Sequence, residues 1–213
     1  MVMVNKDLKR RIIEIAYKNK LSHLGSYFSC VDTIAWIFET KQPDDIFILS
    51  NGHAALAQYV VLEKHYGHDA EMLFKKHGGH PHWDEDNHIY CSTGSLGTGL
   101  SVAVGRALAN TKRIVHVMVS DGECAEGVIW EALKYIDVHN VLNIHTYVML
   151  NGYGAYDPIS SHKLQTQMEA FNNEGRMAFV NCSSEEFPFL HDLNAHYHIM
   201  KEPDYKLAME MTQ

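Results

Sequence analysis

The strongest constraint on the fold of this chain is a strand, helix, strand pattern between residues 114 and 150. Residues 114–119 read Ile-Val-His-Val-Met-Val, a short apolar run typical of a buried strand, and residues 143–150 form a second such run. The segment between them, 127–138, has helical periodicity. Strands joined through a helix in this way run parallel with a right-handed crossover, and parallel sheets carry helices on both faces. We therefore expect an α/β fold, a parallel sheet with helices on both faces.

Other segments extend this pattern toward both ends of the chain. Helices are expected at residues 8–19, 31–39, 53–66 and 98–110, and a short strand at 46–49. The intervening residues 67–93 are rich in Gly, His, Asp and Pro, so we expect them to be largely loop. The helix at 98–110 carries Gly99, Ala103 and Ala107 on one face. This face can serve association with another chain or packing inside its own domain, and the sequence leaves both open.

The size and charge of the chain limit the classes of function that it can have. Its 213 residues, 46% of them hydrophobic, suit one ordinary domain with a sizeable core. The formal charge of −8 argues against a broad surface for nucleic acid. No apolar stretch approaches the roughly 18 residues that span a bilayer, and charges occupy the place of a signal-peptide core. We therefore expect a cytoplasmic protein that binds neither membrane nor nucleic acid.

Cysteine and histidine spacing gives little support for a transition-metal site. The cysteines are scattered and form no C-x-x-C pair, so they indicate neither a zinc ribbon nor a redox motif. Histidines crowd at positions 77, 80, 82 and 88. Their spacing matches no standard zinc pattern, and no second Cys/His cluster would close such a site.

The two strands of the first pattern each end in residues that suit a metal ion and a phosphate. Ser120-Asp121-Gly122-Glu123 follows one strand and Asn151-Gly152-Tyr153 follows the other. Ligands of open parallel sheets bind outside the carboxyl ends of the strands. A carboxylate and an amide oxygen suit Mg²⁺ or Ca²⁺, and a glycine lets the backbone approach a phosphate closely. The alternative is that Asp-Gly and Asn-Gly are only turns.

The spacing of these residues resembles that of thiamine-diphosphate enzymes, in which a G-D-G motif is followed about thirty residues later by asparagine. Here Asp121 and Asn151 are 30 positions apart (151 − 121 = 30), and Ser120 replaces the first glycine. Residues 121–132 resemble the transketolase version of the motif. Other segments resemble transketolase in the family's order, at residues 22–26, 49–59, 79–81 and 93–101. The chain is therefore similar to the diphosphate- and metal-binding part of the transketolase family.

The resemblance implies roles for particular residues. Thiamine diphosphate and Mg²⁺ or Ca²⁺ would be the cofactors, and the metal ligands would be Asp121, Asn151 and the backbone carbonyl of Tyr153. The cofactor contacts would further include His53 and Gly122 at the diphosphate and Gly94 and Leu96 at the aminopyrimidine. The residues of the substrate channel would be His23 and His80. For each histidine, the alternative is a structural or surface role.

The resemblance reaches less fully into the last third of the sequence. Residues 190–198 and 203–209 look like the family's W-H segment and closing helix, which makes His196 a candidate diphosphate or substrate contact, although the tryptophan is Ala195 here. We expect residues 1–213 to form a single thiamine-diphosphate-binding domain, shortened from about residue 158 relative to the family. Glu126 and Glu131 match acids that lie near the family's subunit interface, or they form a solvated helix face.

The resemblance implies a subunit that needs a partner. In the family, a glutamate of the pyrimidine-binding domain helps to activate the cofactor, and no residue here is assigned that role. We expect a second polypeptide with pyrimidine-binding and C-terminal domains, in a heterotetramer with two copies of each chain. The leading hypothesis is a transferase of carbohydrate metabolism that moves a two-carbon ketol unit between sugars or sugar phosphates. The alternatives are deoxyxylulose-phosphate synthesis, oxo-acid decarboxylation, or a non-catalytic cofactor-binding subunit.

Overall fold

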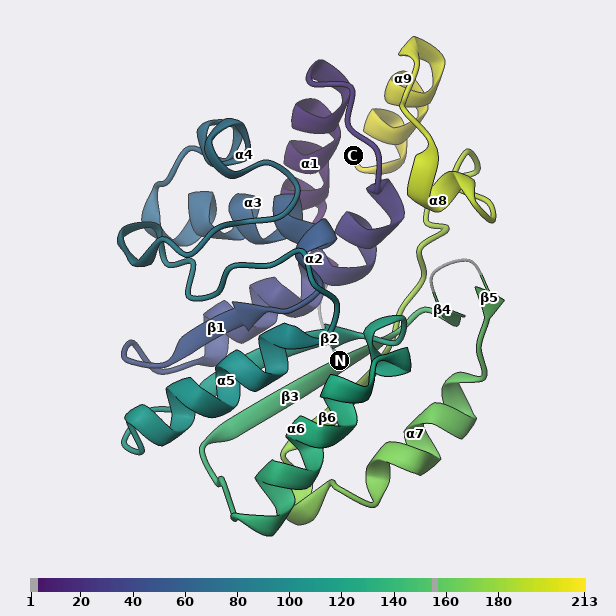
Figure 1. The fold of residues 1–213 in the computed structure, drawn as a ribbon. Coiled ribbons are helices and arrows are strands. Elements are labelled where there is room, and N and C mark those ends of the chain that lie inside the picture. The colour runs from purple at the N-terminus through teal and green to yellow at the C-terminus, as the bar shows by residue number, and fades with distance from the viewer. Residues whose placement is uncertain (1–3, 155–156) are drawn as a thin grey trace. The chain divides into compact units, whose positions relative to one another are not determined.

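The computed structural model describes residues 4–154 and 157–213, and its chain forms two compact units. We call them the helical unit, which comprises residues up to 41 together with 53–79 and 183–213, and the sheet unit, which comprises residues 42–52 and 80–182. Figure 1 labels the elements of both. The two units are described separately below.

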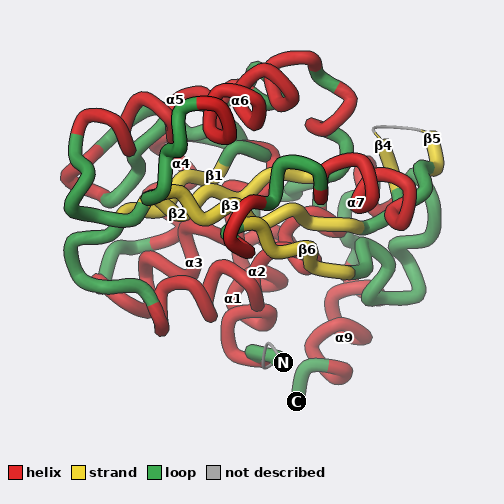
Figure 2. The backbone as a smooth tube through the Cα atoms, turned by 90° about the horizontal axis from the view of Figure 1, so that it is seen from below, coloured by secondary structure: helices red, strands yellow, loops and turns green. Residues whose placement is uncertain are grey.

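The sheet unit is built on four parallel strands, which Figure 2 shows in yellow. Their spatial order is β1 (Ile46–Leu49), β2 (Val115–Ser120), β3 (Ile144–Leu150) and β6 (Met177–Asn181). Val115 is in register with Ile144, and Ser120 is in register with Met149. Nearly all residues of β1, β2 and β3 are buried, so neither face of these strands is open to solvent. A separate small antiparallel pair joins β4 (Tyr153–Gly154) to β5 (Asp157–Pro158).

Three helices of the sheet unit share one hydrophobic cluster with the strands. They are α5 (Thr98–Ala109), α6 (Gly127–Val138) and α7 (Ser161–Glu169). The sheet unit also contains the short 3₁₀ turns η2 (Glu85–Asn87), η3 (Glu123–Ala125) and η4 (Asn173–Gly175). The small residues of α5 face inward: Ala103 and Ala107 are fully buried in this cluster. A Cβ atom on Gly99 would lie 2.6 Å from the backbone of Ser50. This face therefore packs inside its own unit, which is the second of the two possibilities that the sequence left open.

The helical unit contains the remaining helices. They are α1 (Lys6–Lys18), α2 (Leu24–Thr40), α3 (Ala55–Tyr66), α4 (Ala70–His77), α8 (Asn194–Tyr197) and α9 (Glu202–Met211), and the turn η1 (Gly52–Ala54) spans the boundary between the units. Helix α1 buries an apolar stripe that includes Ile12 and Ile13. On its partly exposed side, the Arg11 guanidinium donates two hydrogen bonds to the Glu63 carboxylate of α3, at 2.6 and 3.0 Å.

Most of the expected elements are confirmed, including the α/β class and the parallel sheet flanked by helices. Residues 67–93 are largely loop, as expected, but they also contain the helix α4, which was not expected. Asp69 caps that helix by accepting a hydrogen bond from the Met72 amide at 2.9 Å, and Gly78 ends it with a positive φ of 70°. Within the described ranges, no helix is long and apolar enough to cross a membrane.

Candidate cofactor and metal site

Asp121 lies at the carboxyl end of β2, and only 2% of its surface is exposed. Its Oδ2 atom accepts hydrogen bonds of 2.8 Å from the backbone amides of Asn151 and Gly152, which follow β3. Its Oδ1 atom accepts from the amide of Gly122 at 3.0 Å. The structure thus brings together the two strand ends that the sequence singled out.

The loop after β3 is shaped so that its polar atoms face this corner. Gly152 adopts a positive φ of 86°, which favours glycine, and its amide reaches Asp121. The Asn151 side-chain oxygen accepts from the Tyr153 amide at 2.9 Å, which closes a turn of the Asx type. The turn interpretation of Asn-Gly is therefore correct for the local geometry, and the turn contains the proposed ligands Asn151 and Tyr153.

The Asp121 carboxylate is balanced by dipoles alone in the described part of the chain. No lysine, arginine or histidine side chain there forms an ion pair with it. Burial raises the pKa of Asp121, while the amides of Gly152, Asn151 and Gly122 oppose that shift. A divalent cation would supply the missing positive charge, and hard oxygen donors suit Mg²⁺ or Ca²⁺. The residues present fit such an ion.

The substitution of Ser120 for the motif's first glycine is accommodated without backbone strain. Among the described residues, Ser120 is not one of those with a positive φ, so its backbone does not need the left-handed conformation that favours glycine. Its amide donates to Oε2 of Glu123 at 2.9 Å, and its hydroxyl is 3.3 Å from the same oxygen.

Glu123 is the one residue of this region whose role the sequence did not suggest. It has no exposed surface, and its Oε1 atom accepts from the Ser50 hydroxyl at 2.6 Å and from the Gly97 amide at 2.8 Å. Burial raises its pKa, and the hydrogen bonds oppose the shift. The sequence feature that could have indicated this role is an acidic residue two positions after Asp121. In the structure, it is the first residue of η3 and is buried.

The segment expected to approach the aminopyrimidine lies before α5. Gly94 has a positive φ of 119° with open space where a Cβ would lie, and Leu96 is 43% exposed. Thr93 donates to the carbonyl of Pro81 through its amide at 2.9 Å and its hydroxyl at 3.3 Å. Hydrogen bonds therefore join the segments 79–81 and 93–101. The exposed His80 lies immediately before Pro81.

Three other predicted histidines gather within the helical unit. His23 begins α2 in the left-handed conformation, with φ of 64°, and its ring lies 4.0 Å from that of His196 and 6.1 Å from that of His53. The His23 amide donates to the His196 carbonyl at 2.8 Å. Burial lowers the pKa of His196, so its imidazole stays neutral near neutral pH. The sequence order alone could not show that residues 173 positions apart (196 − 23) meet in one cluster.

The acids Glu126 and Glu131 are both exposed on this chain, at the start of α6 and one turn further along. Their exposure fits a solvated helix face and equally an interface position. Among the described residues, no group of three or more His, Cys, Asp and Glu side chains is arranged to hold a metal. The proposed metal site instead combines one carboxylate with an amide and a carbonyl.

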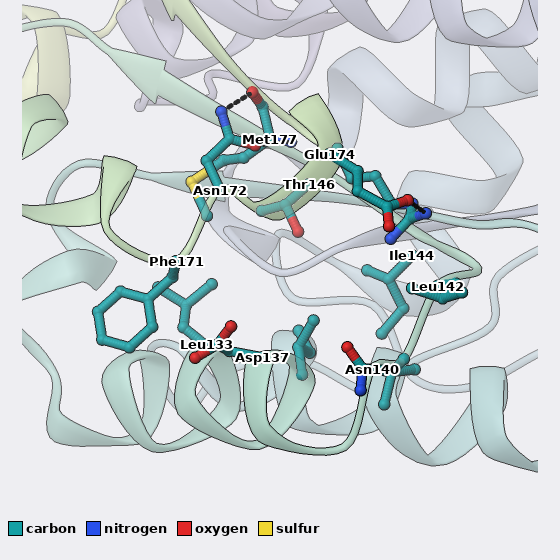
Figure 3. Close-up of a pocket in the computed structure, with 13 residues that line it drawn as sticks. Leu133, Asp137, Asn140, Leu142, Ile144, Thr146, Phe171, Asn172, Glu174 and Met177 are labelled. Atoms are coloured by element: carbon teal, nitrogen blue, oxygen red, sulfur yellow. Dashed lines mark hydrogen bonds and ion pairs between the residues drawn. The ribbon is translucent and has the colours of Figure 1, made fainter.

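A pocket lies at the opposite ends of the strands from Asp121. Figure 3 shows its lining residues, which come from the end of α6, the start of β3 and the turn before β6. Ile144 and Met177, which line it, are the first residues of their strands. A strand of seven residues spans roughly 20 Å at about 3.3 Å per residue. This pocket is therefore separate from the strand ends where ligands of parallel sheets bind.

Comparison with known proteins agrees with this geometry. Residues 39–152 match the family described as transketolase, thiamine diphosphate binding domain, which is more than half of the chain. The chain belongs to the transketolase family. The matched range contains the strand ends, the loop before α5 and His53.

Individual members of the transketolase family give the extent of the likeness. The chain is 34% identical to an apulose-4-phosphate transketolase subunit of Phocaeicola vulgatus over 58% of its own length and 51% of that protein. The protein of the same name from Actinobacillus succinogenes is also 34% identical, over 79% of this chain and 70% of its own. A transketolase structure from Campylobacter jejuni shares the fold, with a TM-score of 0.65 at 16% identity, over 98% of this chain and 43% of its own. The chain thus spans about half of the Phocaeicola relative.

Proposed function

We propose that this chain is the N-terminal subunit of a heteromeric transketolase-like enzyme that transfers a two-carbon ketol unit between sugars by means of thiamine diphosphate. The observation that carries the proposal is the Asp121 carboxylate, which binds the Asn151 and Gly152 amides across the ends of two parallel strands. Its support comes from membership of the transketolase family and from relatives that are named as subunits.

In the proposed site, each residue keeps the role that its motif implies. Asp121, Asn151 and the Tyr153 carbonyl hold Mg²⁺ or Ca²⁺. His53 and Gly122 contact the diphosphate, while Gly94 and Leu96 contact the aminopyrimidine through their backbones. When bound, thiamine diphosphate supplies the carbon-centred chemistry of ketol transfer. The chain's own part is to neutralise the diphosphate through a metal and to fix the cofactor's orientation.

The histidines of the proposed site bind and orient the sugar. His23 and His80 line the substrate channel, and His196 contacts the substrate or the diphosphate. A neutral imidazole offers one donor and one acceptor, which suits the hydroxyl groups of a sugar. The lowered pKa of His196 keeps it in this form under ordinary conditions. Glu126 is a further cofactor-binding residue, and it lies close to a subunit interface that also includes Glu131.

The proposed partner is a second polypeptide that carries the pyrimidine-binding and C-terminal domains of a transketolase. We further propose a heterotetramer with two copies of each chain, and a single cofactor-binding domain over residues 1–213 that is shortened from about residue 158. Support for a partner comes from the names of the relatives from Phocaeicola and Actinobacillus, each of which is called a subunit.

The proposal is tested by co-expressing the chain with such a partner and assaying the purified complex with thiamine diphosphate and Mg²⁺. The relatives' names make apulose 4-phosphate the first ketose donor to try, followed by other ketose phosphates, with aldose phosphates as acceptors. Pyruvate as donor tests the alternatives of deoxyxylulose-phosphate synthesis and oxo-acid decarboxylation. Ketol transfer that is abolished by a chelator is the expected result. A complex that uses pyruvate as donor and no ketose would instead support one of these two alternatives. A complex that turns over none of the donors would support a non-catalytic cofactor-binding role.

A further inference from the structure

The Glu123 side chain connects three segments of the sheet unit, two of which the proposed function places at the cofactor. We infer that Glu123 is a positioning residue. Through hydrogen bonds from Ser50, Gly97 and Ser120, it holds the turn after β2, which contains Asp121, in a fixed position relative to the loop before α5, which contains Gly94 and Leu96. The inference rests on the proposed function, because it assigns Glu123 to the same site.

The contacts of Glu123 divide evenly between its two oxygens. Oε1 accepts from the Ser50 hydroxyl at 2.6 Å and from the Gly97 amide at 2.8 Å. Oε2 accepts from the Ser120 amide at 2.9 Å, with the Ser120 hydroxyl at 3.3 Å. An ionised carboxylate only accepts hydrogen bonds, so it suits a position surrounded by donors. Because the side chain has no exposed surface, water cannot replace a lost contact cheaply.

Each donor belongs to a segment with a separate task. Ser50 follows β1, Gly97 closes the loop that contains Gly94 and Leu96, and Ser120 immediately precedes Asp121. Glu123 therefore reaches 73 residues back to Ser50 and 26 residues back to Gly97. The side-chain hydrogen bonds of Glu123 go to Ser50, Gly97 and Ser120, and none goes to a proposed metal ligand. It acts on the site through the backbone of Ser120 and Gly97.

The packing around Glu123 leaves the segments little freedom to shift independently. A Cβ atom on Gly97 would approach Val128 to 2.8 Å, and one on Gly99 would approach the Ser50 backbone to 2.6 Å. The start of α5 is thus confined between Ser50 and the start of α6. Within this space, the carboxylate determines how the loop before α5 meets the turn after β2.

Glutamine cannot reproduce the contacts of Glu123. A carboxamide has one oxygen and one NH₂ group, whereas each Glu123 oxygen accepts from a backbone amide. In either orientation, the NH₂ group of Glu123→Gln would face the N–H of Gly97 or of Ser120. The substitution therefore breaks one of the two links while conserving the volume of the side chain.

Asp45 provides a matched control for a purely structural role. It is also buried, and its two oxygens accept from the amides of Ile114, at 2.8 Å, and Gln42, at 3.0 Å. It precedes β1, so it lies at the opposite end of the sheet from Asp121. Asp45→Asn removes the same kind of carboxylate by the same chemistry, far from the proposed cofactor residues.

The experiment compares complexes of the proposed partner with the wild-type chain, Glu123→Gln or Asp45→Asn by titrating Mg²⁺ at saturating thiamine diphosphate in a calorimeter. We expect Glu123→Gln to weaken Mg²⁺ binding by about 10- to 100-fold, the usual cost of losing a group behind the metal ligands. Asp45→Asn should lower the melting temperature but leave Mg²⁺ affinity within about two-fold, since it breaks no contact behind those ligands. Ser50→Ala, which removes only a hydroxyl donor, is a milder second variant, and we expect it to weaken Mg²⁺ binding in the same direction.

Amide hydrogen exchange tests the linkage independently of the cofactor. In the wild-type chain, the amides of Gly97 and Ser120 should be protected, and Glu123→Gln should expose one of them while leaving Ile114 protected. Equal Mg²⁺ affinity in the wild type and Glu123→Gln, or fast exchange of both amides in the wild type, would overturn the inference. A complex with the partner that binds no thiamine diphosphate, while the amides of the chain respond as described, would count against the proposed function instead.

Discussion

The Asp121 side chain accepts a hydrogen bond of 2.8 Å from the backbone amide of Asn151, which lies 30 residues further along the chain. Helix α6 and strand β3 between them return the chain to the same edge of the sheet, where Ser120 is in register with Met149. The backbone of one proposed ligand is thereby fixed by the side chain of the other. The proposed metal site at this corner would therefore be largely preorganised before an ion binds.

We predict that Asp121→Asn reduces Mg²⁺-dependent binding of thiamine diphosphate by about 100-fold or more, since it removes a ligand and its charge. Asp86→Asn is the control, because Asp86 is an exposed aspartate of the same unit. Titration calorimetry with both cofactors measures the effect. Equal affinities in the two variants would remove Asp121 from the site.

Asn151→Ala separates the role of a ligand from that of a structural link. The variant keeps the main-chain amide that donates to Asp121 and loses only the side-chain oxygen, which accepts from Tyr153. We expect Mg²⁺ affinity to fall by about 10-fold or more, because an oxygen ligand is lost, while the melting temperature changes by only a few degrees. Calorimetry and thermal unfolding of the same sample decide between the roles. A large fall in melting temperature with unchanged affinity would make Asn151 structural.

The parts of the fold and of the candidate site that could be predicted from the sequence are those that depend on residues close together in the chain. Periodicity identified β1 and α6 at their observed bounds, and the strand ends followed from the rule for parallel sheets. Helix α4 was missed because its composition favoured a loop, whereas the Asp69 cap and the buried Leu73 stabilise it. The role of Glu123 needed the three-dimensional arrangement, since its partners at Ser50 and Gly97 are distant in sequence.

Two glycines of α5 should respond oppositely to alanine. Gly99→Ala places a Cβ atom 2.6 Å from the Ser50 backbone, so we expect destabilisation of about 1–3 kcal/mol from overpacking. Gly105→Ala meets no atom within 4 Å and should stabilise the helix by up to about 1 kcal/mol. Chemical denaturation of both variants gives the two free energies. The inward orientation of Gly99 would be refuted if both variants gained stability.

The partly buried histidines should make the chain less stable in mild acid. Burial lowers the pKa of His196 below its ordinary 6.5, so in the window below 6.5 the unfolded chain binds more protons than the folded chain. Stability should therefore fall as the pH decreases through this window. His65 and His145 shift in the same direction.

The pH effect is assigned by comparing the wild type with His196→Gln in denaturant titrations between about pH 7.5 and 5.5. Asp121 and Glu123 have raised pKa values, so their contributions act in the opposite direction, but they are common to both proteins and cancel in the difference. We expect a smaller loss of stability on acidification in His196→Gln. Parallel pH curves for the two proteins would show that His196 titrates normally.

The last prediction concerns dependence on a partner chain. A purified polypeptide of these 213 residues, saturated with thiamine diphosphate and Mg²⁺, should show no ketol transfer by itself. In the transketolase family a carboxylic side chain of the pyrimidine-binding domain helps to activate the cofactor, and no residue of the matched domain is assigned that task. The buried Glu123 is committed to Ser50, Gly97 and Ser120.

Loss of a positioned proton-transfer group typically costs about 10²–10⁴ in rate, and loss of a whole domain's substrate contacts should cost more. Activity should therefore appear only when the partner chain is added, and it should rise to a plateau at a fixed ratio of the two chains. Asp121→Asn supplies the control, since it should join the complex without restoring turnover. Ketol transfer by the purified chain alone, shown to be free of host transketolase, would contradict the two-chain proposal, because every group needed for the chemistry would then have to come from this chain.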